Sequence, residues 1–300
     1  MKKLVPALAI VFCVTQASAC SICIAHAIGA GLSGVGAQTL GHGKFTFGVS
    51  TLTFSKTQTS EEETEDALVQ EKHDHQETTF ELSYGLTDQL LLRSSLPYVT
   101  RGLTVGSDPA IVTQGLGDAS LGFTYQLPPK WGDKVLLSFT GDIKFPTGRN
   151  SLKDSNGNLL EEHSQIGTGT TDYSAGLQAT SELGRGLVFG SVSFRKNGTS
   201  DRDYRYGDVV FYSVGYSMTF DSQSSLILEF NGRSAKKDRM ANGSFDENSG
   251  GQLGYLSISA RRSLSKNLGL IVSYQSPIHR KLNGTQVESP ILTIGLRGGF

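Results

Sequence analysis

The sequence predicts an all-β fold: a transmembrane, antiparallel, up-and-down β-barrel of about 12 strands. A short apolar segment before the barrel could plug its lumen. Three observations lead to this prediction. Segments of alternating apolar and polar residues recur along the chain, the connections between them are alternately tight and long, and the chain opens with an export signal.

The alternation has a period of two residues, which places apolar and polar side chains on opposite faces of a strand. Between residues 135 and 145, for example, Leu137 and Phe139 lie on one face, and Ser138 and Thr140 lie on the other. Such segments occur at 44–56, 78–85, 89–100, 118–127, 134–146, 170–181, 186–196, 208–220, 224–234, 251–263, 268–277 and 290–300.

The connections between these segments alternate in length without exception. Tight turns on one side and long loops on the other are typical of outer-membrane barrels. A soluble β-sandwich also shows alternation, but it needs neither this rule for its loops nor an export signal. The long connections are 57–77, 101–117, 147–169, 197–207, 235–250 and 278–289.

Residues 1–19 have the pattern of a signal peptide. Lys2 and Lys3 precede a short apolar run, and Ala17-Ser18-Ala19 forms a cleavage site of small residues. The chain therefore divides into a signal peptide (1–19), an N-terminal segment (20–43) and a barrel (44–300). Export of a barrel predicts the cell outer membrane as its location, with outer-membrane lipid and the barrel assembly machinery as partners.

Cys20, Cys23 and His26 open the mature chain and leave three alternatives. Cys20 could carry a lipid, the two cysteines could form a local disulfide, or the three residues could bind a metal. A closed structural zinc site needs four ligands, and only three are present. We expect no cofactor.

The overall charge excludes one class of partner. The chain has 27 basic and 28 acidic residues and a net charge of −1, so we expect no nucleic-acid partner. One stretch is strongly acidic, from Thr59 to Glu77, and it contains His73 and His75. We expect a solvated loop there, with a divalent-cation site as the alternative.

The polar face of the strands carries charges of both signs. Such residues belong in a wet or internally paired interior, so they either pair across a constricted lumen, which we favour, or line a small aqueous path. The apolar residues of segment 20–43 could enter this interior as a plug. The predicted lumen-lining residues are Glu81, Arg93, Asp142, Lys144, Glu229, Asn231, Arg233, Arg261 and Arg297.

Phe300 ends an alternating apolar face that includes Leu292, Ile294 and Leu296. A terminal aromatic residue on such a face resembles the signal that the barrel assembly machinery reads.

Several short strings occur in an order that resembles the family of outer-membrane barrels named after the meta pathway of phenol degradation (MetA). The resemblance covers residues 45–300. We expect these strings to shape loops and turns rather than to bind a ligand. They include Tyr84-Gly85-Leu86-Thr87-Asp88, Gly115-Leu116-Gly117-Asp118, Phe145-Pro146-Thr147-Gly148, Gly167-Thr168-Gly169 and Gly207-Asp208.

The resemblance implies an outer-membrane channel or transporter-like barrel for small molecules, hydrophobic or aromatic ones in particular. It names no solute and carries no catalytic residues. A structural or adhesive barrel without transport is one alternative, and a barrel-borne hydrolase is another. A hydrolase needs a serine beside a histidine base. We expect all six histidines in the N-terminal segment or in loops, so the prediction is that the chain is not an enzyme.

Overall fold

The computed structural model describes residues 37, 39–59, 69–128 and 135–300. The predicted signal peptide, Cys20, Cys23, His26 and most of segment 20–43 lie outside the described residues. Within these ranges, no helix is long and apolar enough to cross a membrane. The described residues form β-strands and a short 3-10 turn, η2 (Glu162–Ser164).

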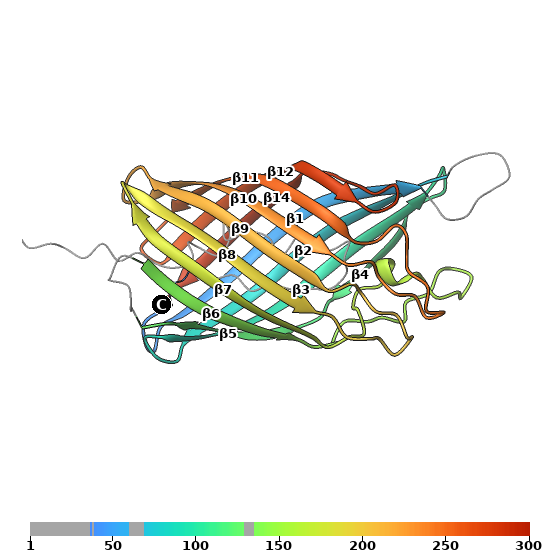
Figure 1. The fold of residues 1–300 in the computed structure, drawn as a ribbon, viewed down its shortest axis with the longest axis horizontal. Coiled ribbons are helices and arrows are strands. Elements are labelled where there is room, and N and C mark those ends of the chain that lie inside the picture. The colour runs from blue at the N-terminus through green and yellow to red at the C-terminus, as the bar shows by residue number, and fades with distance from the viewer. Residues whose placement is uncertain (1–36, 38, 60–68, 129–134) are drawn as a thin grey trace, which may run out of the picture.

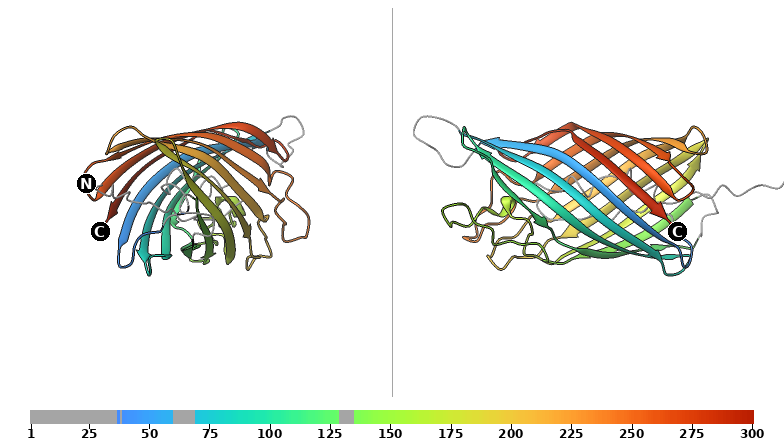
Figure 2. Two further views of the ribbon diagram at one scale, coloured as in Figure 1. Left: turned by 60° about the vertical axis from the view of Figure 1, so that its left-hand side comes forward. Right: turned by 180° about the vertical axis from the view of Figure 1, so that it is seen from behind.

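All the strands belong to one antiparallel sheet that closes on itself (Figures 1 and 2). Closure occurs at β1, which pairs with β2 on one side and with β14 on the other. The sheet contains 14 strands, but the barrel has twelve strand positions. β4 and β5 pair with successive parts of β3 and therefore occupy one position around the barrel. β13 is only a two-residue pairing with the end of β1. The strands are β1 (Phe45–Thr59), β2 (Gln70–Gly85), β3 (Leu90–Val105), β4 (Ile111–Leu116), β5 (Ser120–Gln126), β6 (Val135–Lys144), β7 (Asp172–Leu183), β8 (Gly186–Lys196), β9 (Val209–Thr219), β10 (Ser224–Ala235), β11 (Gly251–Ser263), β12 (Leu268–Leu282), β13 (Val287–Glu288) and β14 (Ile291–Gly299).

The predicted alternation of connections is confirmed. The tight turns gather at one end of the barrel and the long loops at the other, as Figure 1 shows. We call these the turn end and the loop end. β1 begins and β14 ends at the turn end. There Phe45 and Phe300 exchange two backbone hydrogen bonds of 2.9 and 3.0 Å.

The outer face of the barrel is apolar and the inner face is polar. On β11, Leu256 and Ile258 are exposed, whereas the alternating Ser257 and Ser259 are almost completely buried. A water-soluble domain buries its apolar side chains. Here the apolar side chains face outward, and this arrangement requires a lipid environment. A closed sheet also leaves no unpaired edge in the hydrocarbon. The predicted transmembrane barrel is confirmed.

The prediction for the acidic stretch is wrong in its second half. β2 begins at Gln70, within the residues predicted to form a long loop. His73 and His75 are buried on its inner face, and Lys72 and Asp74 lie on its outer face. Both faces are polar here because the strand extends beyond the apolar band, and polar residues on both faces give no alternation signal.

Two further expectations need correction. β4 lies within the stretch 101–117 that was predicted as a loop, because it extends the β3 hairpin at the loop end. The expectation that every histidine lies outside the strands is wrong for His73 and His75 on β2 and for His279 on β12.

Candidate functional site: the barrel interior and its loop-end cap

The residues predicted to line the lumen all occupy inward positions of their strands. They alternate with exposed apolar neighbours: Glu229 is 1% exposed, and the adjacent Leu228 is 49% exposed. Asp142 and Arg261 are partly buried, and the others are buried: Glu81, Arg93, Lys144, Glu229, Asn231, Arg233 and Arg297. Their role in lining a path for solutes stays a prediction.

Several of these charges pair inside the barrel. Arg93 on β3 donates to Asp142 on β6 over 2.8 Å. Arg233 on β10 forms an ion pair with Glu288 on β13, and the hydroxyl of Tyr255 donates to the same carboxylate over 2.8 Å. Buried charges are tolerated when they are paired and hydrogen-bonded. These inward charges are therefore paired with each other and with hydroxyl groups.

Lys144 is the centre of a buried cluster that several strings of the family pattern build. Its Nζ lies 3.1 Å from Asp118 Oδ2 and 2.7 Å from Asp172 Oδ2. The Asp118 carboxylate also accepts the backbone N–H groups of Gly148 and Thr168, each over 2.9 Å. These residues come from separate loops and anchor them to the strand ends. Their structural role is the one expected from the sequence.

An apolar cluster faces inward near the loop end, and the sequence analysis missed it. Aromatic rings of the cluster lie beside polar neighbours: Phe54 is 4.9 Å from the His75 ring, and the Arg195 guanidinium is 5.2 Å from the Phe211 ring, measured between centres. The interior therefore contains an apolar section at this level, and smaller apolar pairs face inward elsewhere, at Phe189 and Ile227 and at Leu40 and Leu91. This inner apolar cluster consists of Leu52, Phe54, Val209, Phe211, Leu253, Tyr255 and Ile291.

A signal for this cluster exists in the sequence. Apolar residues occur on both faces where β9 leaves the loop end, at Val209 and Phe211 on the inside and Val210 and Tyr212 on the outside. A lipid-facing barrel strand needs only one apolar face. A second apolar face at the loop ends of several strands therefore marks an apolar interior at one level.

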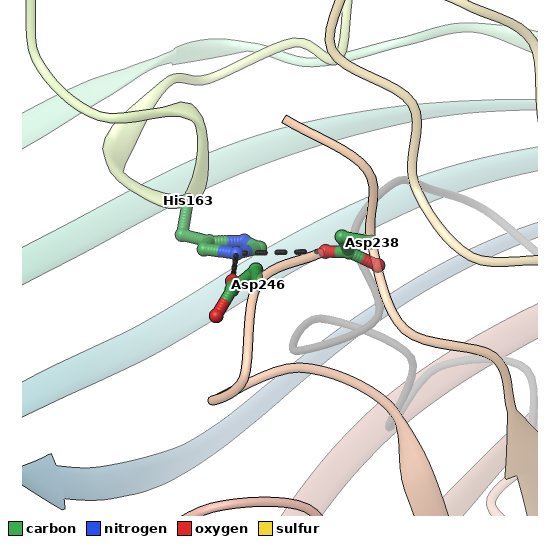
Figure 3. Close-up of side chains that lie close together, drawn as sticks. All are labelled: His163, Asp238 and Asp246. Atoms are coloured by element: carbon green, nitrogen blue, oxygen red, sulfur yellow. Dashed lines mark hydrogen bonds and ion pairs between the residues drawn. The ribbon is translucent and has the colours of Figure 1, made fainter. Parts of the chain in front are cut away.

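Three long loops meet above this level around His163 (Figure 3). His163 Nε2 lies 3.4 Å from Asp246 Oδ2, 3.6 Å from Asp238 Oδ2 and 3.2 Å from the Tyr204 hydroxyl. The backbone of η2 is held from below, because Arg101 on β3 donates to the carbonyl of His163 over 2.6 Å. No local pattern in the sequence marks His163 as a member of this cap, because the cap is formed by loops that lie far apart in the chain.

The electrostatics of the cap link the two loops that carry His163 and Asp246. Burial lowers the pKa of the His163 imidazole, but the hydrogen bond to Asp246 and the charges of Asp238 and Glu161 together raise that pKa above its ordinary value. Burial raises the pKa of Asp246, but the interaction with His163, the backbone N–H of Asn248 and the charge of Lys56 together bring that pKa below its ordinary value. The charge of the buried Lys56 lowers both pKa values, so a cation already lies near these groups.

The last residues of the N-terminal segment pass beneath the turn end and into the interior. His42 N–H donates to Asp88 Oδ1 over 2.9 Å, and Leu40 packs on the inward Leu91. Ala37 is fully buried, and its N–H donates to Thr180 Oγ1 on β7 over 2.9 Å. Its carbonyl accepts a hydrogen bond from Ser138 on β6. This segment therefore runs from the β2–β3 turn to the inner wall at β6 and β7.

A family model described as "Putative MetA-pathway of phenol degradation" matches residues 59–280. No curated protein matches the sequence. An outer membrane channel from Pseudomonas putida F1 has a similar structure, with a TM-score of 0.67, 14% identity, and coverage of 88% of this chain and 98% of that one. The translocator domain of the autotransporter NalP from Neisseria meningitidis matches with a TM-score of 0.52 and 10% identity, over 87% of this chain and 90% of that one.

Proposed function

The chain belongs to the family described as "Putative MetA-pathway of phenol degradation", and from this premise we propose that it is an outer-membrane channel for small hydrophobic or aromatic molecules. The solved structure from Pseudomonas putida F1 is itself described as an outer membrane channel. The apolar outer face suits a lipid environment. Outer-membrane barrels have short periplasmic turns and long extracellular loops, so in the proposed orientation the turn end faces the periplasm and the loop end faces the outside.

The observation that carries the proposed solute class is the inner apolar cluster. A wall of paired charges and hydroxyl groups would bind water better than hydrocarbon. The cluster that includes Phe54, Phe211 and Tyr255 is the largest apolar section of the described interior, and it lies just inside the loop-end cap. An apolar solute would gain contact area there, at about 25 cal/mol per Å² of apolar surface removed from water. The polar wall below it would let the solute leave again.

The N-terminal segment is the proposed gate of this channel. Ala37 and Leu40 are bound inside the barrel, and His42 is bound to the β2–β3 turn. This supports the hypothesis that segment 20–43 enters from the periplasm as a plug.

Uptake by intact cells tests the solute class. Cells that make the protein should take up a radiolabelled monoaromatic compound faster than cells without it. The double substitution Phe54→Ser and Phe211→Ser should slow this uptake while ion conductance in planar bilayers persists. The matched control is Thr53→Ser, on the outer face of the same strand. Equal uptake by the double variant and the wild type would contradict the role of the apolar cluster.

The same measurements separate the alternatives. A structural or adhesive barrel would give neither conductance nor uptake above background. The family and the channel-like neighbour agree with the prediction that the chain is not an enzyme, and the proposal assigns no catalytic residue.

A further inference from the structure

Three oxygen atoms converge on one nitrogen atom in the loop-end cap. Asp238 Oδ2, Asp246 Oδ2 and the Tyr204 hydroxyl all lie within 3.6 Å of His163 Nε2. One imidazole nitrogen carries at most one hydrogen, so it makes one strong hydrogen bond. The Tyr204 hydroxyl uses its own hydrogen on Asp238 Oδ2, over 2.9 Å. A hydrogen on Nε2 can serve Asp246 while Tyr204 serves Asp238, and a cation in place of that hydrogen would contact Nε2 and both carboxylates at once.

Both carboxylates are oriented for such a cation. The other oxygen of Asp238, Oδ1, accepts the backbone N–H of Gly207 over 2.8 Å. Oδ1 of Asp246 accepts the backbone N–H of Asn248 over 2.8 Å. Each residue thus commits one oxygen to the backbone and directs the other toward His163. Metal-binding carboxylates are commonly fixed in this way by hydrogen bonds outside the coordination sphere.

The imidazole is equally well positioned. The ring of His163 packs edge-on against Tyr204 and Tyr206, with centroid distances of 6.0 and 5.9 Å. Its main chain is tied to the barrel wall by Arg101. His163 and Asp238 are buried, so a cation bound to them would be shielded from bulk water.

We propose that His163, Asp238 and Asp246 form a divalent metal site that ties two extracellular loops together over the mouth of the barrel. One ligand atom from each residue lies within 4.8 Å of the others. Tetrahedral zinc, with bonds of about 2.0–2.1 Å, separates its ligands by about 3.4 Å. The distances of 3.4 and 3.6 Å from Nε2 to the carboxylate oxygens fit this geometry. Water takes the fourth position.

The composition of the site selects zinc as the first probe. One imidazole and two carboxylates offer borderline and hard donors, which suit Zn²⁺ better than Ca²⁺ with its preference for six to eight oxygens. The two carboxylates balance the charge of the ion. The site is separate from the inner apolar cluster, so the metal site can be tested independently of the proposed function.

Zinc binding to the purified full-length protein in detergent tests the proposal. After treatment with a chelator, Zn²⁺ alone is titrated against wild type, His163→Asn, Asp246→Asn and the control His279→Asn, which removes an exposed histidine of β12. Folding of each variant is checked by circular dichroism. Loss of a ligand should weaken zinc binding by at least about tenfold in the first two variants, since even loss of an outer hydrogen bond costs that much. The control should bind like the wild type.

Two further measurements identify the site. Cobalt bound at this site should show a spectrum without thiolate charge transfer, which distinguishes it from binding at Cys20 and Cys23. Zinc should slow tryptic cleavage in the loop 236–250 of the wild type and leave cleavage of Asp246→Asn unchanged. Binding of equal affinity in the wild type and in folded Asp246→Asn would overturn the proposal. So would the absence of stoichiometric binding to the wild type.

Discussion

Removal of the N-terminal segment should open the barrel without preventing its assembly. The perturbation joins the signal peptide directly to Gly43. Because β1 begins at Phe45, no strand is lost. The deletion removes the contacts of Ala37 and Leu40 inside the barrel and those of Thr39 and His42 with the β2–β3 turn.

The magnitude of these contacts explains how the segment can act as a gate. Six hydrogen bonds hold Ala37, Thr39 and His42. At about 0.5–1.5 kcal/mol each they contribute roughly 3–9 kcal/mol. Burial of Leu40 adds about 2 kcal/mol. Ordering about six residues costs about 6–12 kcal/mol. The two sums nearly cancel, so these contacts alone hold the segment only marginally and one substitution should release it.

Gly85→Ala is that substitution, because a Cβ at Gly85 would lie 2.3 Å from the carbonyl oxygen of Gly41. The assay is single-channel conductance in planar bilayers. The deletion should conduct more than the full-length protein, and Gly85→Ala should approach the deletion. Gly102→Ala is the control, since its Cβ would find no atom closer than 3.6 Å. Equal conductance of the deletion and the full-length protein would refute the reasoning, and the segment would then be only a tail.

Three further predictions concern the barrel itself. Val214→Arg on the lipid face should lower the free energy of unfolding in lipid by about 2–4 kcal/mol, whereas Ser213→Ala on the inner face should cost about 1 kcal/mol; equal values in urea titrations would mean that the register is wrong. Deletion of Phe300 should slow insertion and leave protein in the periplasm, and cell fractionation with unchanged outer-membrane levels would exclude this role. Asp118→Ala should destabilise the barrel by about 3–5 kcal/mol, because it removes a buried partner of Lys144; a loss below about 1 kcal/mol in the same titrations would contradict it.

The barrel could be predicted from the sequence because lipid imposes one rule on every strand. An outer residue in hydrocarbon must be apolar, and its neighbours then face the interior. The prediction failed where lipid no longer acts on the strand. In the loop-end half of β2, His73, Asp74 and His75 carry no alternation of polarity, although the backbone pairing with β1 continues without interruption.

The candidate sites were predictable only in part. The inward charges follow from strand parity alone, which identifies residues such as Glu229 and Arg297 as inward without the structure. The loop-end cap depends on loops that meet only after the barrel closes. His163 and Asp246 are far apart in the sequence, and neither stands in a recognisable ligand spacing. No local pattern could have brought them together.

The seam between β1 and β14 has a consequence for how the protein folds. Thr46 pairs with Gly299, and this register continues through Thr53 and Leu292. Every other barrel strand can form beside a neighbour that is close in the chain, but this pairing joins residues from opposite ends of it. The loss of chain entropy on bringing these distant strands together precedes the stabilisation by their contacts, and this makes folding slow. Until then, the first and last strands both present unpaired edges to other chains. Closure of the seam, rather than formation of the hairpins, is therefore the expected rate-limiting step and the stage at which aggregation competes with folding.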